Sequence, residues 1–209
     1  MSTSPRPEKD DIALALGRAV IAWNMAENAV RGLLASLAAG RPHEVIAARI
    51  LTSDLGAEGI VTGLKTFAQL SLVADAADAV VHVAGCYERL YDYRTYYIGG
   101  ISEVQSLIDQ PAPLGVITSP IAKGKLSEHR ELIGADKLDT FRLQSAQLAA
   151  YSKQVRKHLG LHPATTRGDR PSLPKKPAKP EVLVRPHEDA KVYAPSSYTW
   201  RRLLFRMTS

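Results

Sequence analysis

The strongest constraint on the fold is a regular spacing of apolar and small side chains near the N-terminus. Such side chains recur at alternate intervals of four and three residues, at Ile12, Leu16, Ala19, Trp23, Ala26, Val30, Leu33 and Leu37. Residues at this spacing share one face of an α-helix, whereas a half-buried β-strand requires strict alternation. The pattern therefore predicts one long helix, which begins near Asp10 and ends at Gly40, before Pro42. Its many alanines favour close packing against other helices of the same chain.

The helical period returns in four later segments, at about residues 45–50, 60–67, 73–94 and 138–159. Hydrophobic residues make up 45% of the chain while aromatic residues make up only 6%, a mixture that suits packed helices better than a β-sandwich. We therefore expect a mainly α fold, a helical bundle of about five helices.

The period disappears between residues 96 and 133, where glycines and prolines separate short β-branched runs. This stretch predicts a small β-hairpin or three short strands inserted before the last helix. The predicted organisation is a flexible N-terminus at 1–8, a helical domain at 9–160 and a C-terminal tail at 161–209.

The predicted tail differs from the domain in charge and in composition. Residues 1–160 contain 17 Lys and Arg against 17 Asp and Glu, whereas residues 161–209 contain 10 against 4 and so carry the whole net charge of +6. Seven of the 13 prolines also lie there, so we expect an extended, disordered tail. Its cationic side chains are candidates for phosphate contacts, above all Lys175, Lys176, Lys179, Arg201 and Arg202. Residues 197–206 combine large apolar groups with arginines and could fold on binding a partner.

Several classes of protein are disfavoured by what the sequence lacks. Cys86 is the single cysteine, which excludes an internal disulfide framework and a cysteine-rich zinc site. The first ten residues contain no apolar signal segment, and no run of 18 apolar residues occurs, so we expect a cytoplasmic protein with no membrane partner. No phosphate-binding glycine loop, metal-ligand spacing or nucleophile elbow is present, so we expect no cofactor and no metal.

The most informative stretch for function runs from Tyr91 to Gly100, where a predicted helix ends in an arginine, a tyrosine pair and two glycines. It resembles the signature of the HEPN superfamily, helical domains that include many RNases of toxin and defence systems. That signature is Arg-Asn-x-x-x-His, often followed by Gly. Aligned on Arg94, this chain has Thr95 for the Asn, Gly99 for the His and Gly100 for the following Gly, so two of four positions match.

Two further features agree with the resemblance. Trp23 and Glu27 resemble a Trp-x-x-x-Glu pattern that precedes the signature in related sequences, and the family also has a short β insertion after the motif and a closing helix. In such an RNase the arginine holds the scissile phosphate and the histidine moves a proton. A glycine at position 99 cannot move a proton, so the resemblance implies a degenerate active site.

Each of these residues also has a purely structural interpretation. Arg94 could complement the C-terminal dipole of its helix or form a buried pair with Glu27. The five tyrosines between residues 87 and 97 could belong to the core or an interface rather than to a base-stacking platform, and Trp23 is expected in the core. They are Tyr87, Tyr91, Tyr93, Tyr96 and Tyr97.

Our hypothesis is a HEPN-like domain, homodimeric by family analogy, that has lost the RNase histidine and works in binding or regulation. Its candidate binding residues are Arg94, Tyr96, Tyr97, Glu27 and Trp23. Two alternatives stay open: an active metal-independent RNase that uses Arg94, and an adaptor that binds nucleic acid or a protein through its basic tail.

Overall fold

The computed structural model describes residues 9–39, 44–98, 115–118, 121–122, 125–126, 129–132, 134–161 and 171–182. Within these ranges the protein is mainly helical, as predicted, with α1 (Lys9–Ala39), α2 (Val45–Thr52), α3 (Ala57–Ser71), α4 (Ala74–Tyr97) and α5 (Ala135–His158). None of the described helices is both long and apolar enough to cross a membrane.

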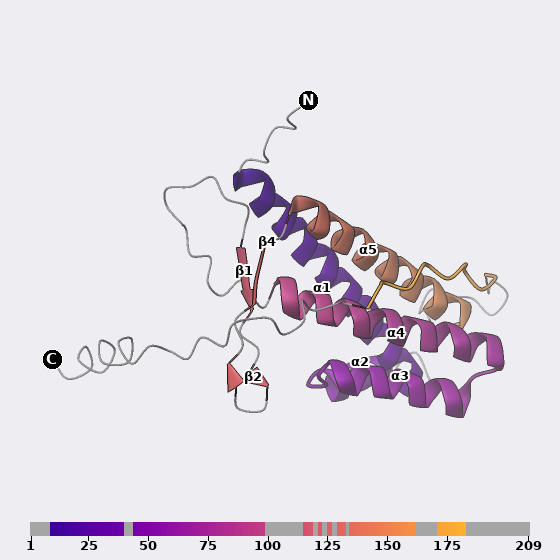
Figure 1. Ribbon diagram of the computed structural model, residues 1–209. Helices are drawn as coiled ribbons and strands as arrows, with labels where there is room; N and C mark the ends of the chain where they lie inside the picture. Colours follow the sequence, from indigo (N-terminus) through magenta and orange to yellow (C-terminus); the bar gives the residue numbers. More distant parts are fainter. Residues whose placement is uncertain are drawn as a thin grey trace.

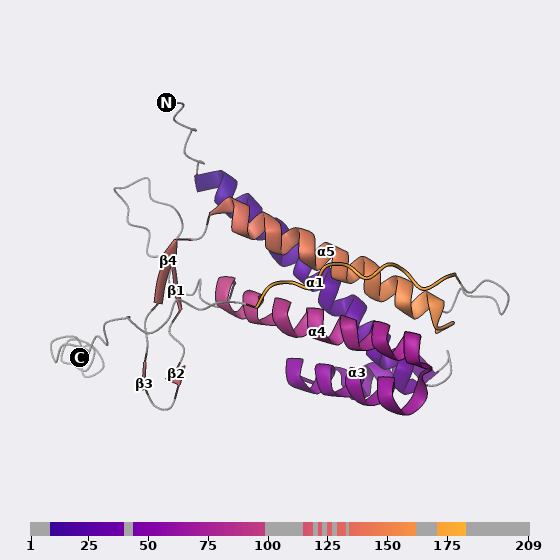
Figure 2. The same ribbon diagram turned by 45° about the vertical axis from the view of Figure 1, so that its right-hand side comes forward.

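The helices form a bundle organised around the long first helix. α1 and α5 lie side by side over much of their length, and α4 packs against α5 and against α3 (Figures 1 and 2). The short α2 packs on the C-terminal part of α1. α4 is thereby held between two neighbouring helices, and its last turn lies near the first turn of α5 (Figure 2).

The core confirms the spacing seen in the sequence of α1. Ala19, Ala26, Val30 and Leu33 are completely buried, and Trp23 is nearly so. Small residues at two of these positions let the neighbouring helix approach closely, while the large ones fill the space between. The periodic face of α1 therefore packs against the rest of the bundle.

Four short strands lie among the described residues between α4 and α5. β1 (Gly115–Thr118) pairs antiparallel with β4 (His129–Leu132), and β2 (Ile121–Ala122) pairs antiparallel with β3 (Lys125–Leu126). The predicted start of this region at residue 96 is wrong, because α4 continues through Tyr97. Burial explains the difference: the side chains of Tyr96 and Tyr97 pack into the core and extend the apolar face of the helix by one turn.

Part of the predicted tail is ordered on the bundle, which corrects the expectation of disorder for all of residues 161–209. Residues 171–182 form neither helix nor strand and run along α4 and α5 (Figure 2). Pro180 is buried, and Leu173 packs against the core. Residues 1–8, 162–170 and 183–209 lie outside the described residues, and with them the predicted segment 197–206, Arg201 and Arg202.

Candidate functional site

Arg94 lies in the last turn of α4 with its side chain partly exposed. This position agrees with the predicted helix end. The positions of Gly99 and Gly100 lie outside the described residues. The structure therefore locates the arginine of the motif but not the positions that follow it.

The hypothesis of a Glu27–Arg94 pair is wrong. The Oε1 atom of Glu27 accepts hydrogen bonds from Nε and Nη2 of Arg31, at 3.1 and 3.0 Å, and lies 3.5 Å from the Tyr87 hydroxyl, which donates to it. Residues 27 and 31 are one helical turn apart on α1, a separation at which oppositely charged side chains meet. The carboxylate is thus neutralised locally and leaves Arg94 without this partner.

Arg31 also joins α1 to the connection between α2 and α3. Its guanidinium donates hydrogen bonds to the backbone carbonyls of Thr52, Ser53 and Leu55, at 3.3, 3.2 and 3.1 Å. Carbonyls near helix ends lack partners within the helix, so these bonds hold the connection in place. Glu27 and Arg31 therefore have a structural role, because together they join α1 to this connection.

Trp23 is also a core residue. Its ring stacks on Tyr87 with centroids 5.4 Å apart and on Phe141 with centroids 6.1 Å apart. Offset aromatic stacks of this kind stabilise a core beyond the area that they bury. With only 2% of its surface exposed, Trp23 cannot contact a ligand directly.

The tyrosines at the end of α4 form one side of a hollow. Tyr97 contacts Tyr93 with ring centroids 5.4 Å apart, and it meets Phe141 of α5 edge to face at 6.3 Å. Tyr96 and Tyr97 are each only 6% exposed, whereas Tyr93 is partly exposed. The structure therefore makes Tyr93 more accessible than Tyr96 and Tyr97, the two rings that the sequence analysis kept as candidate binding residues.

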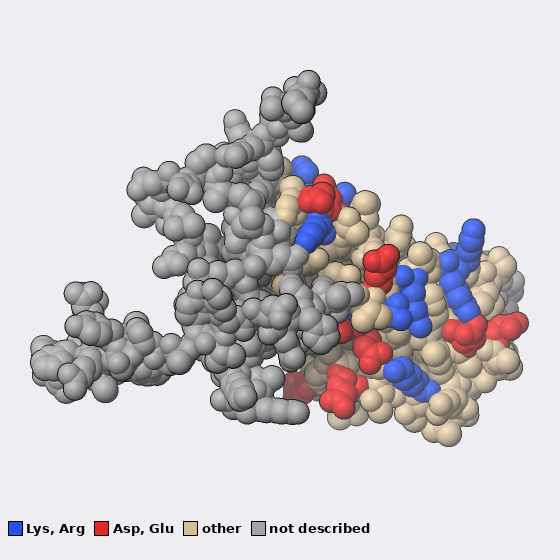
Figure 3. All heavy atoms as spheres, viewed as in Figure 1, with Lys and Arg blue, Asp and Glu red and all other residues tan. Residues whose placement is uncertain are grey.

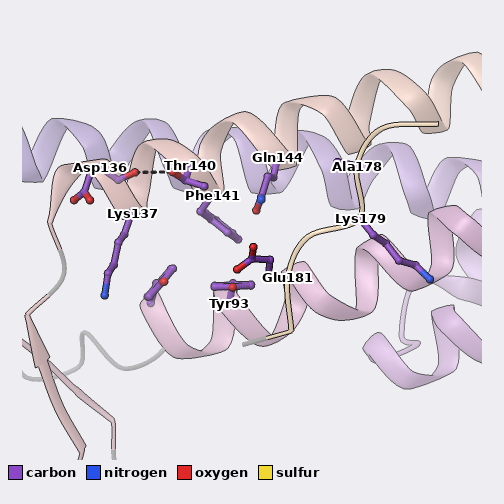
Figure 4. A pocket seen from close by; sticks show the side chains of 10 residues that line it. Tyr93, Asp136, Lys137, Thr140, Phe141, Gln144, Ala178, Lys179 and Glu181 are labelled. Atoms are coloured by element: carbon purple, nitrogen blue, oxygen red, sulfur yellow. Dashed lines mark hydrogen bonds between the residues drawn. The ribbon is translucent and has the colours of Figure 1, made fainter. Parts of the chain in front are cut away.

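The hollow has a volume of about 430 Å³ and lies between the end of α4, the start of α5 and residues 178–181 (Figure 4). Its wall combines three aromatic rings with polar groups, and it comprises Tyr93, Tyr97, Asp136, Lys137, Thr140, Phe141, Gln144, Ala178, Lys179 and Glu181. Gln144 and Glu181 point toward its centre beside Tyr93, whereas Lys179 points away along α4 (Figure 4). We call this hollow the aromatic pocket.

The polar wall of the aromatic pocket combines the acceptor groups of Asp136 and Glu181 with the donor group of Lys137 and with Thr140 and Gln144, which can do both. The Thr140 hydroxyl donates to the Asp136 carbonyl at 2.9 Å, which leaves its oxygen able to accept a further bond (Figure 4). Burial, and then the nearby Glu181 carboxylate, raises the pKa of the Tyr93 hydroxyl above its ordinary value of 10.0. Tyr93 therefore stays protonated at neutral pH and cannot serve as a general base.

The sequence contains a pattern of polar residues that could have predicted part of the pocket's polar wall. Asp136, Thr140 and Gln144 recur every four residues beside the apolar stripe of α5. This spacing places them on one helical face. Glu181 could not have been found in the same way, because it reaches the pocket only through the path of residues 171–182.

Two of the lysines predicted to contact phosphates are engaged with α4 instead. Lys176 forms a salt bridge with Asp78, and the side chain of Lys179 lies over Gly85, where an added Cβ would come within 2.8 Å of its Cε atom. Lys175 is exposed. Of these three lysines, Lys175 has the side chain that agrees best with the expected phosphate contact.

Basic and acidic side chains are interspersed over the described part of the face seen in Figure 3. A surface that binds a nucleic acid mainly through its phosphates needs clustered cations instead. This face of the bundle therefore lacks the charge pattern of a surface that binds nucleic acid mainly through its phosphates.

A second group of titratable side chains lies farther along α4. The Nε2 atom of His82 is 3.4 Å from Sγ of Cys86 and 3.0 Å from the Pro177 carbonyl, and its ring meets Tyr151 of α5 edge to face. Burial raises the pKa of the Cys86 thiol to about 11. Since the thiolate is the reactive form, Cys86 is not a nucleophile at neutral pH despite its histidine neighbour. No group of three or more potential metal ligands occurs in the part of the chain that the structure describes.

Comparisons with protein-family models, with curated proteins and with solved structures give no match for this chain. Functional inference therefore depends on the residues and their geometry.

Proposed function

We propose that this protein is a HEPN-like helical domain that has lost the RNase histidine and acts as an RNA-binding module, with one unstacked base held in the aromatic pocket. The observation that carries the proposal is the combination of accessible aromatic surface with hydrogen-bond acceptors in a pocket of about 430 Å³. Pockets of about 300 to 1,000 Å³ hold small organic groups, and single-stranded RNA is recognised through stacked bases and their edges.

The chemistry of the wall favours particular bases. The Tyr93 ring offers a stacking surface, and the carboxylate of Glu181 beside it accepts hydrogen bonds but donates none. Adenine, cytosine and guanine each present an exocyclic amino group that a carboxylate can bind, whereas uracil has none. We therefore expect a preference for these three bases over uracil.

Arg94 supplies the phosphate contact in this proposal. It neighbours Tyr93 in sequence, occupies the same last turn of α4 as Tyr97, and is not neutralised by Glu27. A guanidinium at this place can hold a phosphate through two parallel hydrogen bonds. The order of elements, with the strands β1 to β4 after the motif and α5 as closing helix, is the order that the HEPN resemblance implies.

Binding of short RNA homopolymers to the full chain tests the proposal. Loss of one stacked base costs about 1–3 kcal/mol, so Tyr93→Ala should weaken binding of adenine, cytosine or guanine polymers about 5- to 150-fold. Glu181→Gln should remove the preference over uracil. Asp92→Asn is the control, because Asp92 is an exposed neighbour of Tyr93 that does not line the pocket.

The same experiment distinguishes the alternatives. Cleavage of the RNA by the wild-type chain, abolished by Arg94→Ala, would establish the active RNase instead. Binding that Tyr93→Ala leaves unchanged but that moderate salt abolishes would assign RNA binding to the basic tail. Absence of any RNA binding would overturn the proposal.

We also propose that the protein is a homodimer, with α2 in the interface. Ile46, Ile50 and Leu51 are 74%, 69% and 81% exposed on this helix of eight residues. Contiguous exposed apolar patches mark protein interaction sites, whereas apolar residues that are exposed singly are common on any surface. Ile46→Asp with Ile50→Asp should turn a dimer into a monomer in sedimentation equilibrium, and an unchanged mass would contradict this interface.

A further inference from the structure

Residues 171–182 have a periodicity that explains how they lie on the bundle. Prolines occur at every third position, at Pro171, Pro174, Pro177 and Pro180. A polyproline II helix has three residues per turn, so this spacing places all four prolines along one edge. The segment thus matches the pattern of the proline-rich peptides that bind in grooves of other proteins.

Side chains of α4 and α5 bind the backbone carbonyls along this segment. His158 Nδ1 lies 2.7 Å from the Pro171 carbonyl, and His82 Nε2 lies 3.0 Å from the Pro177 carbonyl. Arg89 donates to the Pro180 carbonyl. Because proline has no N–H group, its carbonyl is the backbone group through which a partner can bind it. Three of the four prolines are held in this way.

The residues between the prolines also have matching partners. The salt bridge of Lys176 with Asp78 places a cation beside a carboxylate of α4, and Gly85 leaves room for the stem of Lys179. Leu173 contacts the core, and Pro180 is buried. Hydrogen bonds to carbonyls, apolar packing and a salt bridge therefore all hold the same segment. This combination is typical of a specific binding site rather than of a nonspecific contact.

We infer that the surface formed by Asp78, His82, Gly85, Arg89 and His158 is a recognition site for lysine-bearing polyproline II segments. We call it the polyproline groove. In this structure its ligand is the chain's own segment 171–182, bound in cis. Its ligand class is a peptide with proline at every third position and lysine between, and the inference does not depend on RNA binding.

Because residues 171–182 are covalently linked to the bundle, they compete strongly with any free peptide for the polyproline groove. Nine residues, 162–170, link Leu161 to Pro171. A short link gives an effective concentration on the order of millimolar. A groove with an intrinsic Kd of about 0.1 mM would then be occupied in cis in about nine molecules of ten, and a free peptide would bind about tenfold more weakly than to an empty groove.

Full-length chains and a fluorescent peptide with the sequence of residues 171–182 test the inference by anisotropy. Lys176→Glu with Pro177→Gly weakens the cis segment while leaving the groove intact. The peptide should bind this variant about tenfold more tightly than it binds the wild-type chain. A peptide of identical composition, shuffled so that no two prolines stand three apart, is the matched control and should bind neither chain.

Substitutions in the groove complete the test. Asp78→Lys, combined with Pro174→Gly and Pro177→Gly so that the cis segment is weakened but keeps Lys176, should abolish binding of the wild-type peptide and restore binding of a peptide that carries Lys176→Glu. Circular dichroism of each variant verifies that the bundle is folded. Failure of the folded, weakened variant to bind the periodic peptide would overturn the inference, as would equal binding of the shuffled peptide.

Discussion

A double-mutant cycle on Glu27 distinguishes the two arginines that could neutralise it. The variants are Glu27→Gln, Arg31→Met, Arg94→Met and the two double variants that combine Glu27→Gln with each arginine change. Methionine keeps most of the aliphatic stem of an arginine while removing its charge and hydrogen bonds. The cycle measures whether removing one partner changes the cost of removing the other.

The structure sets the expected size of each coupling. The Glu27 carboxylate lies 3.0 Å from Arg31 Nη2, and both side chains are 27% exposed. An exposed pair contributes about 0.2–1 kcal/mol, whereas a hydrogen bond to a buried charged group contributes about 1.5–3 kcal/mol. This partly buried pair with two hydrogen bonds should therefore couple by about 1–2 kcal/mol. Glu27 and Arg94 should couple by less than about 0.5 kcal/mol.

The single substitutions should also differ. Arg31→Met loses its bonds to Glu27 and to the carbonyls of Thr52, Ser53 and Leu55. At about 0.5–1.5 kcal/mol for each bond, the free energy of unfolding should fall by roughly 3 kcal/mol. Arg94→Met should change it by no more than about 0.5 kcal/mol, as substitutions of partly exposed side chains usually do.

Urea unfolding followed by far-UV circular dichroism gives the free energy of unfolding for each variant. A coupling above about 1 kcal/mol between Glu27 and Arg94, together with none between Glu27 and Arg31, would refute the arrangement described above. It would restore the buried pair that the sequence suggested.

Three further predictions concern α4 and the signature positions at and just after its end. Cys86, whose pKa is raised to about 11, should react with a disulfide reagent at pH 8 at least about tenfold more slowly than free cysteine, and unfolding in urea should abolish the difference. Burial, as the largest cause, lowers the pKa of His82 below its ordinary 6.5, so the neutral form is favoured in the folded chain. The contribution of His82 to the free energy of unfolding is therefore present above pH 6.5, and it is lost as the pH falls through the lowered pKa. Between about pH 7 and 5, the free energy of unfolding should fall more steeply in the wild-type chain than in His82→Gln. The wild-type chain should cleave no RNA. The double substitution Gly99→His with Thr95→Asn rebuilds the signature. Cleavage that this variant gains, and that the further substitution Arg94→Ala abolishes, would support a decayed active site.

The sequence was sufficient to predict the helices because their determinants are local. Each of the five begins and ends within a few residues of the expected positions, since an amphipathic helix shows its period in the chain itself. The one misplaced boundary with a clear cause is the end of α4. Tyr96 and Tyr97 continue the helix because they pack into the core, and a glycine-rich stretch immediately after them gave no sign of that packing.

Pairings between distant residues were decided by the tertiary structure alone. The Glu27–Arg31 pair is local, since its residues stand one helical turn apart on α1, and their spacing in the sequence could have shown it. Only the rotation of α1 in the bundle brings the same carboxylate to Tyr87 of α4 and leaves it unpaired with Arg94. Spacing shows which residues share a helical face, but it does not show which face of another helix lies opposite.

What the sequence by itself determined is the helical bundle, because the 3.6-residue period of buried side chains is a local property of the chain. What only the tertiary structure decided is the fate of residues 171–182. By composition this segment predicts disorder, since it has too few apolar groups to form a core of its own. It is ordered because α4 and α5 present Asp78, His82, Arg89 and His158 along its path. Those contacts, which exist only after the helices have packed, offset the entropy lost in fixing the segment.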